Sequence, residues 1–380
     1  MWKVPFVGYI QQYKNNKTEF DNAYHKCDAR GAYIFQKESQ DFEDQLAKFS
    51  GAEYGIGTGS CTGALHIALW ALGIGPGDEV ITVAHTFVAT IDVIARLGAT
   101  PVLIDIDEKS MNMNEDLIEA AITPKTKAIM PVHLNGRICN MDKIMEISKK
   151  HNLFVIEDAA QAVGAKFKGK GFFGNASCFS FYPAKLLGSQ SEGGMAITSN
   201  GEFAKKLYLY RDHGLYPGYV LDKFNIKEDS KIIHCWGGNT ILDNKDAAFL
   251  LVKLKYFPEY VKKRRQLAQL YHDGLKDVSE VRLPYAPDED KDYYDVFQNY
   301  VIRVNKRNEL NKFLNDNGIE TILSWPIPNH KQKALKELHK FKLPVTEKIS
   351  NEVISLPMFP ELTDEQIKYV VEVIKKFYTK

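Results

Sequence analysis

Apolar and polar positions in the first two-thirds of the chain alternate between short runs typical of buried strands and longer runs with helical spacing. The pattern predicts strands at 79–83, 101–106, 128–132, 153–156, 176–181 and 194–198. It predicts helices at 65–72, 87–97 and 141–151. Short apolar strands separated by helices indicate parallel β-α-β units and a sheet that is covered on both faces.

The pattern changes after about residue 245. A long helix is expected at 244–275, then a strand at 300–304 and helices at 307–317 and 364–378. We therefore predict an α/β protein with a large domain at 1–245 and a smaller α+β domain at 246–380. Ligands of such parallel sheets bind beyond the carboxyl ends of the strands.

Composition narrows the class of protein. The chain has 380 residues, a net charge of +1 and no long block of like charge, which predicts neither a nucleic-acid partner nor an anionic membrane partner. We found no apolar stretch long enough to predict a membrane span. The five cysteines form no C-x-x-C pair, so we expect no disulfide scaffold, no metal site and a reducing, cytoplasmic location.

One candidate carboxylate stands at the end of the strand expected at 153–156. Asp158 follows this apolar run closely, where a parallel sheet presents its ligand-binding edge. A carboxylate there can pair with a buried cationic heterocycle. Capping of the next turn is an equally simple role for Asp158.

A candidate amine follows the next strand. The β-rich run at 177–182 stops at Pro183, and Lys185 comes directly afterwards among aromatic, small and glycine residues. A lysine in such surroundings can act as a nucleophile and as a base, although most lysines are solvated surface residues. Ser180 could offer its hydroxyl to a phosphate or be an ordinary strand serine.

Two further segments are candidates for ligand contacts. Residues 55–63 read as a glycine-rich loop that enters a helix near Ala64, which could offer N–H groups to a phosphate. The loop matches neither a Walker A sequence nor G-x-G-x-x-G, because position 60 is serine. Phe87, just beyond a strand end, could stack on a planar cofactor or belong to the core.

These residues occur in segments that resemble a known family, the nucleotide-sugar aminotransferases of the DegT/DnrJ/StrS type, which depend on pyridoxal 5′-phosphate (PLP). The matching segments are 60–66, 75–80, 86–90, 98–102, 131–136, 157–164, 179–185, 211–214 and 355–360. The resemblance implies fold type I of the aspartate aminotransferase superfamily. That fold has a large domain with a mostly parallel seven-stranded sheet and a smaller α+β C-terminal domain.

The resemblance also implies how the ring of PLP is held. Lys185 would form the Schiff base with PLP, and Asp158 would pair with the pyridine nitrogen. Gln161 would contact the phenolic oxygen of the cofactor, and Phe87 would stack on the ring. Lys185 and Asp158 are thus the expected catalytic residues.

The phosphate of PLP has its own implied set of contacts. Cys61, Thr62 and Ser180 would hold it from one subunit, and Asn239 would reach the phosphate of the neighbouring subunit. This role of Asn239 implies a homodimer with shared active sites.

The chain departs from the family pattern near Asn239. The family usually has Gly-Tyr-Asn-x-Arg-Leu where this chain has residues 237–242, so Ile241 replaces a common arginine. We expect altered substrate contacts and retained catalysis. Cys61 stands where glycine is frequent, which is compatible with phosphate contacts through the backbone. Related dehydratases carry histidine in place of Lys185, so transamination is favoured over dehydration.

The function implied is transfer of an amino group from glutamate or glutamine to a keto sugar linked to dTDP, UDP or GDP. The product would serve a cell-surface glycan such as the O-antigen of lipopolysaccharide. Trp325, His330 and His85 are candidate substrate contacts, and packing is an equal alternative for the aromatic loop residue. The sequence does not select the nucleotide, the sugar or the carbon that is aminated.

Three alternatives stay open. The first keeps PLP but acts as a cyclitol aminotransferase or a sugar dehydratase. The second is a non-catalytic regulatory homologue that binds PLP, against which the complete set of cofactor residues argues. The third is an unrelated nucleotide-binding protein that uses the glycine-rich loop at 55–63.

Overall fold

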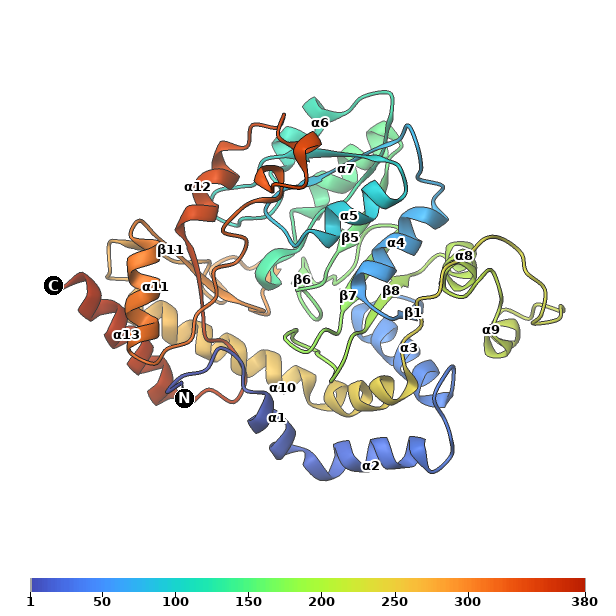
Figure 1. Ribbon diagram of the computed structural model, residues 1–380, viewed down its shortest axis with the longest axis horizontal. Helices are drawn as coiled ribbons and strands as arrows, with labels where there is room; N and C mark the ends of the chain where they lie inside the picture. The colour runs from blue at the N-terminus through green and yellow to red at the C-terminus, as the bar shows by residue number, and fades with distance from the viewer. Residues whose placement is uncertain (1, 380) are drawn as a thin grey trace.

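A seven-stranded sheet forms the centre of the protein in a computed structural model that describes residues 2–379 (Figure 1). The strands follow the order β1-β8-β7-β5-β4-β2-β3. Their bounds are β1 (Tyr54–Thr58), β2 (Glu79–Val83), β3 (Thr100–Ile104), β4 (Thr126–Ile129), β5 (Phe154–Asp158), β7 (Ala176–Ser180) and β8 (Gly194–Thr198). β8 runs in the direction opposite to that of the other six strands of this sheet, which confirms the predicted mostly parallel sheet.

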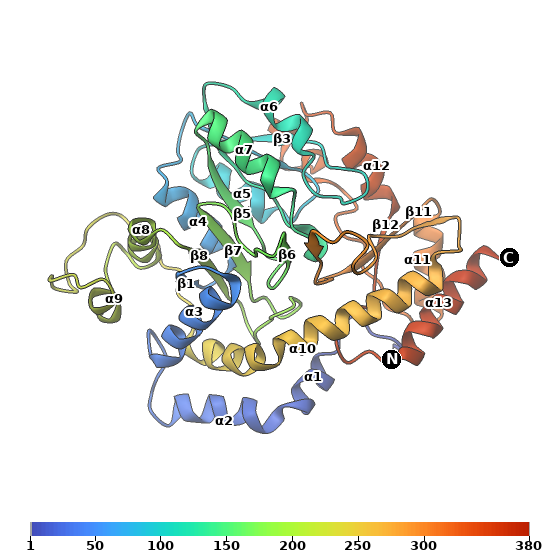
Figure 2. The same ribbon diagram turned by 180° about the vertical axis from the view of Figure 1, so that it is seen from behind.

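Helices cover both faces of this sheet. One face carries α3 (Lys37–Ser50), α6 (Ile118–Ala121), α7 (Met141–His151) and α10 (Asn244–Leu275). The other face carries α4 (Cys61–Ala71), α5 (Ala89–Arg96) and α8 (Gly201–Arg211). Figure 1 looks onto α4 and α5, and Figure 2 looks onto α3 and α7. Alternate strand residues enter the two cores, as with Val155 and Ile156, which explains the continuous apolar runs.

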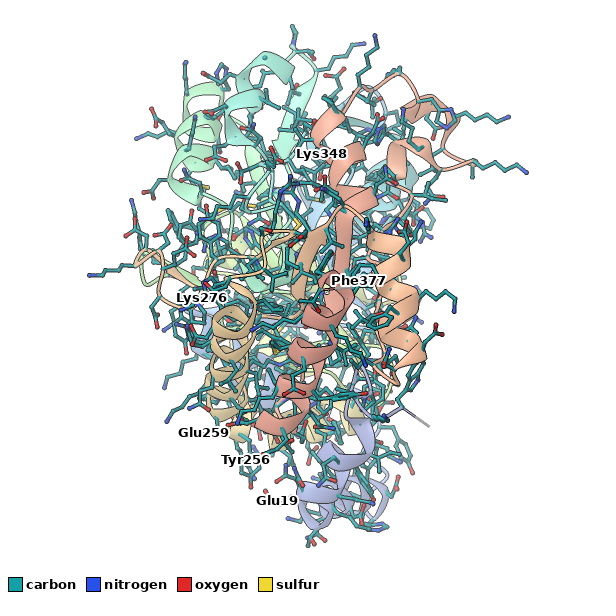
Figure 3. All side chains as sticks on the ribbon, turned by 90° about the vertical axis from the view of Figure 1, so that its left-hand side faces the viewer. Glu19, Tyr256, Glu259, Lys276, Lys348 and Phe377 are labelled. Carbon is teal, nitrogen blue, oxygen red and sulfur yellow. The ribbon has the colours of Figure 1, made fainter. Side chains whose placement is uncertain are left out.

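The long helix α10 joins the large sheet to the C-terminal part. It begins where the Asp243 side chain accepts a hydrogen bond from the Lys245 N–H at 2.7 Å. Its first half packs on α2 (Lys17–Asp28) and α3, and it also packs on α13 (Asp364–Tyr378). Figure 3 shows Tyr256 of α10 beside Glu19 of α2, to which the Tyr256 hydroxyl donates a hydrogen bond.

The C-terminal part contains a three-stranded antiparallel sheet in the order β12-β11-β9. Its elements are β9 (Val281–Arg282), β11 (Tyr300–Val304), α11 (Arg307–Asp316), α12 (Pro344–Glu352), β12 (Val353–Leu356) and α13. A separate pair of strands, β6 (Lys166–Phe167) and β10 (Tyr293–Tyr294), links it to the large sheet. The remaining helices are α1 (Tyr9–Asn15), α9 (Gly218–Lys223) and the short 3-10 turns Glu115–Leu117, Leu134–Gly136, Asn329–Lys331 and Lys336–Leu338.

The two parts exchange segments. Val4 forms a parallel bridge with Ile319, and the Lys3 N–H donates to Gly318 O at 2.9 Å, so the first described residues pack with the C-terminal part. In the opposite sense, Leu338 and Leu343 pack against the large domain. The division at residue 245 agrees with the start of α10 but remains a prediction.

One expectation about the glycine-rich segment was wrong. Residues 54–58 form the edge strand β1, and α4 begins at Cys61 instead of near Ala64. Glycine is needed in this strand because a Cβ at Gly55 would lie 2.4 Å from the Glu43 carbonyl oxygen of α3. The glycines of β1 thus allow the close approach of α3. In the sequence the same glycines indicate a loop, which is why the strand was not predicted.

Within the described range, we find no helix of the length and apolarity that crossing a membrane requires. The five cysteines are free thiols, and four of them are buried.

Candidate active site

The carboxyl edge of the large sheet brings together the ends of four strands. Thr58 of β1 pairs with Gly194 of β8, and Gly194 pairs with Ser180 of β7. On the other side of β7, Cys178 pairs with Asp158 of β5. Two of the predicted residues, Asp158 and Ser180, therefore lie on the same edge because their strands are neighbours in register.

Lys185 lies in the loop between β7 and β8, at the same edge. It is half-buried, and no hydrogen bond to its Nζ is formed by residues 2–379. Burial lowers the pKa of Lys185, while the nearby Asp158 carboxylate and Cys61 thiol act in the opposite direction. The amine is thus close to both groups and more easily neutral than a surface lysine, which a nucleophile and a base require.

Asp158 is buried and held in one orientation. Its Oδ2 accepts a hydrogen bond from the Thr90 hydroxyl at 2.7 Å, and its Oδ1 accepts one from the Ala160 N–H at 3.2 Å. Thr90 is in turn 2.8 Å from the Thr86 hydroxyl. A carboxylate oxygen can accept more than one hydrogen bond, so Asp158 can still receive a cationic N–H.

The N-terminus of α4 offers an anion site next to this edge. The Ser60 side chain caps the helix by accepting from the Gly63 N–H at 3.1 Å, and helix geometry leaves the N–H groups of Cys61 and Thr62 without an acceptor inside the helix. A Cβ at Gly194 would lie 2.4 Å from the Cys61 nitrogen, so β8 closely supports this turn.

Side chains complete the anion site in different ways. The Cys61 thiol is 3.4 Å from Cys178 O and is buried against the sheet, so it does not face a ligand. The group that Cys61 offers to an anion is its backbone N–H, at the first position of α4. The Ser180 hydroxyl accepts a weak hydrogen bond from the Tyr182 N–H at 3.3 Å and keeps its own proton to donate. The donor set of α4 and Ser180 suits a phosphate.

Gln161 and Phe87 each keep a group available to a ligand. The Gln161 Oε1 accepts from the Asn135 N–H at 2.7 Å, which fixes the amide and leaves its NH2 group to donate to an oxygen. The Phe87 side chain is 63% exposed, although the residues that link it to the end of β2, 84–86, are buried. An exposed ring at this edge is consistent with a stacking surface and excludes a core role.

The residues therefore fit PLP. A cationic ring nitrogen, a phenolic oxygen, an aldehyde and a phosphate each have a partner of suitable chemistry at one edge of the sheet, in Asp158, Gln161, Lys185 and the α4 turn respectively.

Two of the three candidate substrate residues are placed inside the protein. His330 is fully buried, with its Nε2 at 3.0 Å from Glu347 Oε1. His85 is buried, lies 3.3 Å from the Ser350 hydroxyl and packs edge-on against Trp325. Neither histidine presents surface to a sugar in this structure, so the structural role is the simpler one for both. Trp325 is half-buried and retains surface for a ligand.

Asn239 is exposed at the surface, and its side chain forms no hydrogen bond in the described range 2–379. Its backbone forms a bridge with Asp212, while the next side chain, Thr240, accepts a hydrogen bond from the Gly59 N–H at 3.1 Å. Ile241 is half-buried beside it. The segment at 237–241 is thus attached to the turn before α4, and its Asn239 side chain faces outward.

Several residues that support the site escaped sequence reasoning. Thr90 orients Asp158, Asn135 orients Gln161, and Gln298 holds the loop of Lys185. The family match at 86–90 ends on Thr90 and was the only available signal for it. Asn135 likewise lies in the family match at 131–136, whereas Gln298 lies in none of the matching segments and is placed by tertiary contacts that no local pattern reveals.

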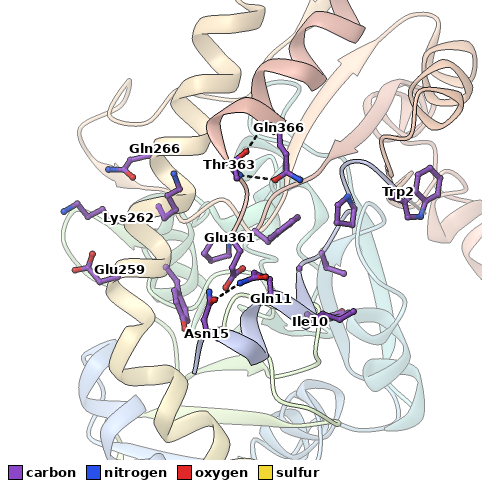
Figure 4. Close-up of a pocket in the computed structure, with 18 residues that line it drawn as sticks. Trp2, Ile10, Gln11, Asn15, Glu259, Lys262, Gln266, Glu361, Thr363 and Gln366 are labelled. Atoms are coloured by element: carbon purple, nitrogen blue, oxygen red, sulfur yellow. Dashed lines mark hydrogen bonds between the residues drawn. The ribbon is translucent and has the colours of Figure 1, made fainter. Parts of the chain in front are cut away.

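A cavity of about 1140 Å³ lies elsewhere, between α1, α10 and the segment before α13 (Figure 4). Its lining includes Trp2, Tyr260 and Glu361 but none of the predicted cofactor residues. Volume alone does not make it the catalytic site, since the polar groups suited to PLP converge at the sheet edge. No group of three or more metal-ligating side chains occurs in residues 2–379.

Comparisons with known proteins agree with this geometry. The model of the DegT/DnrJ/EryC1/StrS aminotransferase family matches residues 14–375. A "pleiotropic regulatory protein" of Geobacillus stearothermophilus is 42% identical over 379 residues, covering 99% of this chain and 98% of the relative. A UDP-N-acetyl-3-dehydro-alpha-D-glucosamine 3-aminotransferase of Acidithiobacillus ferrooxidans is 40% identical over 375 residues, covering 98% and 97%.

The fold has equally clear counterparts. The crystal structure of S. venezuelae DesV in complex with a ketimine intermediate superimposes with a TM-score of 0.93 at 32% identity, and the match covers 100% of both chains. Fold, cofactor chemistry and sequence thus agree, and the chain belongs to the DegT/DnrJ/EryC1/StrS aminotransferase family of PLP-dependent, fold type I enzymes.

Proposed function

We propose that this protein transfers an amino group from glutamate or glutamine to the C3 keto group of a sugar linked to UDP or dTDP. The observation that carries the proposal is the meeting of Lys185, Asp158 and the α4 anion site at one sheet edge. The arrangement supplies an amine of lowered pKa, a buried carboxylate and a phosphate site, which together suit PLP-dependent transamination.

The names of relatives support the sugar class and the carbon. The Acidithiobacillus ferrooxidans relative is named for amination at C3 of a UDP-linked sugar. Relatives from Pseudomonas aeruginosa and Aneurinibacillus thermoaerophilus, each 38% identical, are named for a UDP-linked 3-oxo sugar and for a dTDP-linked 3-amino sugar. We therefore favour a nucleotide-linked 3-keto sugar over a 4-keto sugar or a cyclitol.

The chain's own residues would divide the work as follows. When bound, PLP supplies an electron sink for the carbon that loses a proton. Asp158 would keep a proton on the ring nitrogen, and the α4 N–H groups with Ser180 would hold the phosphate. Lys185 would attach the cofactor through Nζ and, when free and neutral, accept and return the transferred proton. Proton transfer by a positioned base contributes about 10²–10⁴-fold to rate.

We also propose a homodimer in which each site uses Asn239 of the partner subunit. Asn239 is exposed, and its side chain forms no hydrogen bond within residues 2–379. The preceding residues Ile233 and Trp236 expose large apolar side chains, which is typical of a surface that a partner covers.

A regulatory role is the second candidate, because the relative from Geobacillus stearothermophilus carries a regulatory name. The complete cofactor set of this chain favours catalysis over binding alone. The two candidates differ in one outcome, since only the enzyme converts substrate.

The test is incubation of the PLP-loaded protein with glutamate or glutamine and a panel of UDP-, dTDP- and GDP-linked 3-keto and 4-keto sugars, followed by mass spectrometry. We expect a 3-amino sugar product from a UDP or dTDP substrate. Lys185→Ala should remove both the visible absorbance of bound PLP and at least about 10²-fold of the turnover. Lys149→Ala, an exposed lysine on α7, is the control and should behave as wild type.

Three results would contradict the role of Lys185, the enzymatic activity and the cofactor in turn. Turnover that persists in Lys185→Ala would show that this lysine has another role. Bound PLP without any amino-sugar product would favour the regulatory candidate. A colourless protein that does not respond to added PLP would overturn the cofactor assignment as a whole.

A further inference from the structure

The two peptide groups on either side of Lys185 are held by one side chain from the other part of the chain. The Gln298 Oε1 accepts a hydrogen bond from the Leu186 N–H at 2.7 Å, and its Nε2 donates one to Ala184 O at 2.8 Å. Gln298 precedes β11 in the C-terminal part and is buried. A primary amide carries a donor and an acceptor side by side, so it can satisfy an N–H and a C=O together.

Gln298 is itself firmly attached. The Arg264 Nη1 of α10 donates to three carbonyl oxygens around it, those of Phe297 at 3.0 Å, Gln298 at 3.2 Å and Met358 at 2.9 Å. Phe297 has a φ of 51°, in the left-handed region, so the backbone before Gln298 is held in a conformation that needs such support. We call the two hydrogen bonds of Gln298, to Leu186 N–H and Ala184 O, the clamp. The clamp is therefore anchored to α10 and to the segment after β12.

Other side chains hold the same loop before or after this point. The Lys253 Nζ donates to Gly188 O at 2.6 Å, and the Ser191 hydroxyl donates to Asp246 at 2.5 Å. These contacts fix the part of the loop that returns to β8. In the part of the chain that the structure describes, Gln298 is the side chain that bonds the peptide groups both before and after Lys185.

We propose that Gln298 is a positioning residue for Lys185: its amide fixes the peptide groups at Ala184 and Leu186 and so keeps the Lys185 amine beside Asp158 and Cys61. The inference rests on the proposed function, in which Lys185 is the amine that attaches the cofactor and moves protons. It adds that the C-terminal part controls the orientation of this lysine through one hydrogen-bonded amide.

The test compares three variants. Gln298→Met keeps the length of the side chain and loses both hydrogen bonds. Gln298→Glu keeps the acceptor for Leu186 N–H and places a second acceptor against Ala184 O. Asn317→Ala is the matched control, because Asn317 is another amide of the C-terminal part that donates to a backbone carbonyl, Phe313 O at 2.7 Å, at the end of α11.

The first readout uses the protein without PLP. Competitive acetylation over a range of pH, followed by peptide mass spectrometry, reports the pKa and accessibility of Lys185. In Gln298→Met we expect a pKa closer to the ordinary 10.5 and a higher limiting rate of labelling at high pH, because the loosened lysine gains solvent. Gln298→Glu should lie between Gln298→Met and wild type, and Asn317→Ala should match wild type.

The second readout is steady-state kinetics of the PLP-loaded protein. Misplacement of a reacting group by about 1 Å can cost about 100-fold, so kcat should fall by about that factor in Gln298→Met while KM for the amino donor changes little. Thermal unfolding of Gln298→Met and Asn317→Ala measures how much of any loss comes from stability.

Every outcome decides the question. Unchanged Lys185 labelling in Gln298→Met overturns the positioning role, whether or not stability or activity falls. If Gln298→Met does not fold, Gln298→Glu takes the same test, and failure of both variants to fold while Asn317→Ala folds identifies a general structural role instead. Lys185→Ala separates the two proposals: turnover that persists in it contradicts the proposed function and not the clamp.

Discussion

At the scale of single residues, the site depends on how Asp158 is held. Its position at the end of β5 is readable from the sequence, because an apolar strand ends on it. The hydroxyl that orients it comes from Thr90 on α5, 68 positions away along the chain. Sequence reasoning could therefore find the carboxylate but not its hydrogen-bond donor, because the donor is brought there only by folding.

Thr90→Val removes this hydroxyl while keeping the shape of the side chain. A hydrogen bond to a charged group contributes about 1.5–3 kcal/mol, so the dissociation constant for PLP should rise by roughly 10- to 100-fold as Asp158 loses its donor. Titration of the PLP-free protein, followed by absorbance, measures this constant.

The control is Thr82→Val on β2, where a buried threonine donates to Met130 O at 2.8 Å. It should lose stability and keep its affinity for PLP. Equal PLP affinity in Thr90→Val and wild type would show that Asp158 does not depend on this bond.

At the scale of elements, the bounds of a helix can be predicted where its terminal residues carry clear polar signals. The expected bounds of α10 and α7 agree with the structure at both ends, because each combines helical apolar spacing with clear polar signals at its termini. The strand β1 was missed, because Gly55 and Gly57 make room for α3 and remove the apolar pattern. The helices α1 and α2 were also not predicted, because α1 has no buried residue and α2 buries only Phe20 and Cys27, so neither has a continuous apolar face.

The helix α10 carries a pH-sensitive residue, Lys253. Burial lowers its pKa to about 7, Glu361 opposes this, and Arg264 adds to it. Between pH 7 and 10.5 the unfolded chain therefore binds one more proton at this lysine than the folded protein does. The free energy of unfolding should rise with pH across this window, by at most about 1.4 kcal/mol per pH unit. Below pH 7 both states bind the proton, so Lys253 should add nothing to the pH slope there.

Lys253→Met should flatten this rise. Urea unfolding of the PLP-free protein at pH 7, 8 and 9 measures the slope, and Lys255→Met on the exposed side of the same helix should leave it as in wild type. An equal slope in wild type and Lys253→Met would mean that Lys253 stays protonated in the folded protein.

At the scale of the whole molecule, the exposure of Ile233 and Trp236, just before Asn239, has no explanation within a single chain. Trp236 is 89% exposed and Ile233 is 68% exposed. Side chains of this size are rarely left in water together, and the same segment carries the residue expected to complete the partner's site. Dimerisation and cofactor binding should therefore be linked.

Trp236→Glu places a charge in this surface and should shift the protein from dimer to monomer in sedimentation velocity. Its affinity for PLP should fall at the same time, because in the proposed dimer Asn239 of the partner subunit completes the phosphate site. Lys333→Met, at an exposed lysine distant in the chain, also lowers the net charge by one; it is the control for the change in charge and should leave the association state as in wild type. A dimer with full PLP affinity in Trp236→Glu would place the subunit contact elsewhere.

The bridge between Val4 and Ile319 has a consequence for how the protein is made. Val4 is buried among residues of the C-terminal core, so its final neighbours are synthesised some three hundred codons later. At about 5–20 residues per second, a ribosome needs on the order of half a minute to reach them. During that interval Val4 lacks the neighbours that surround it in the folded protein. The large sheet can assemble during translation, whereas the C-terminal core can close only after residue 319 has emerged.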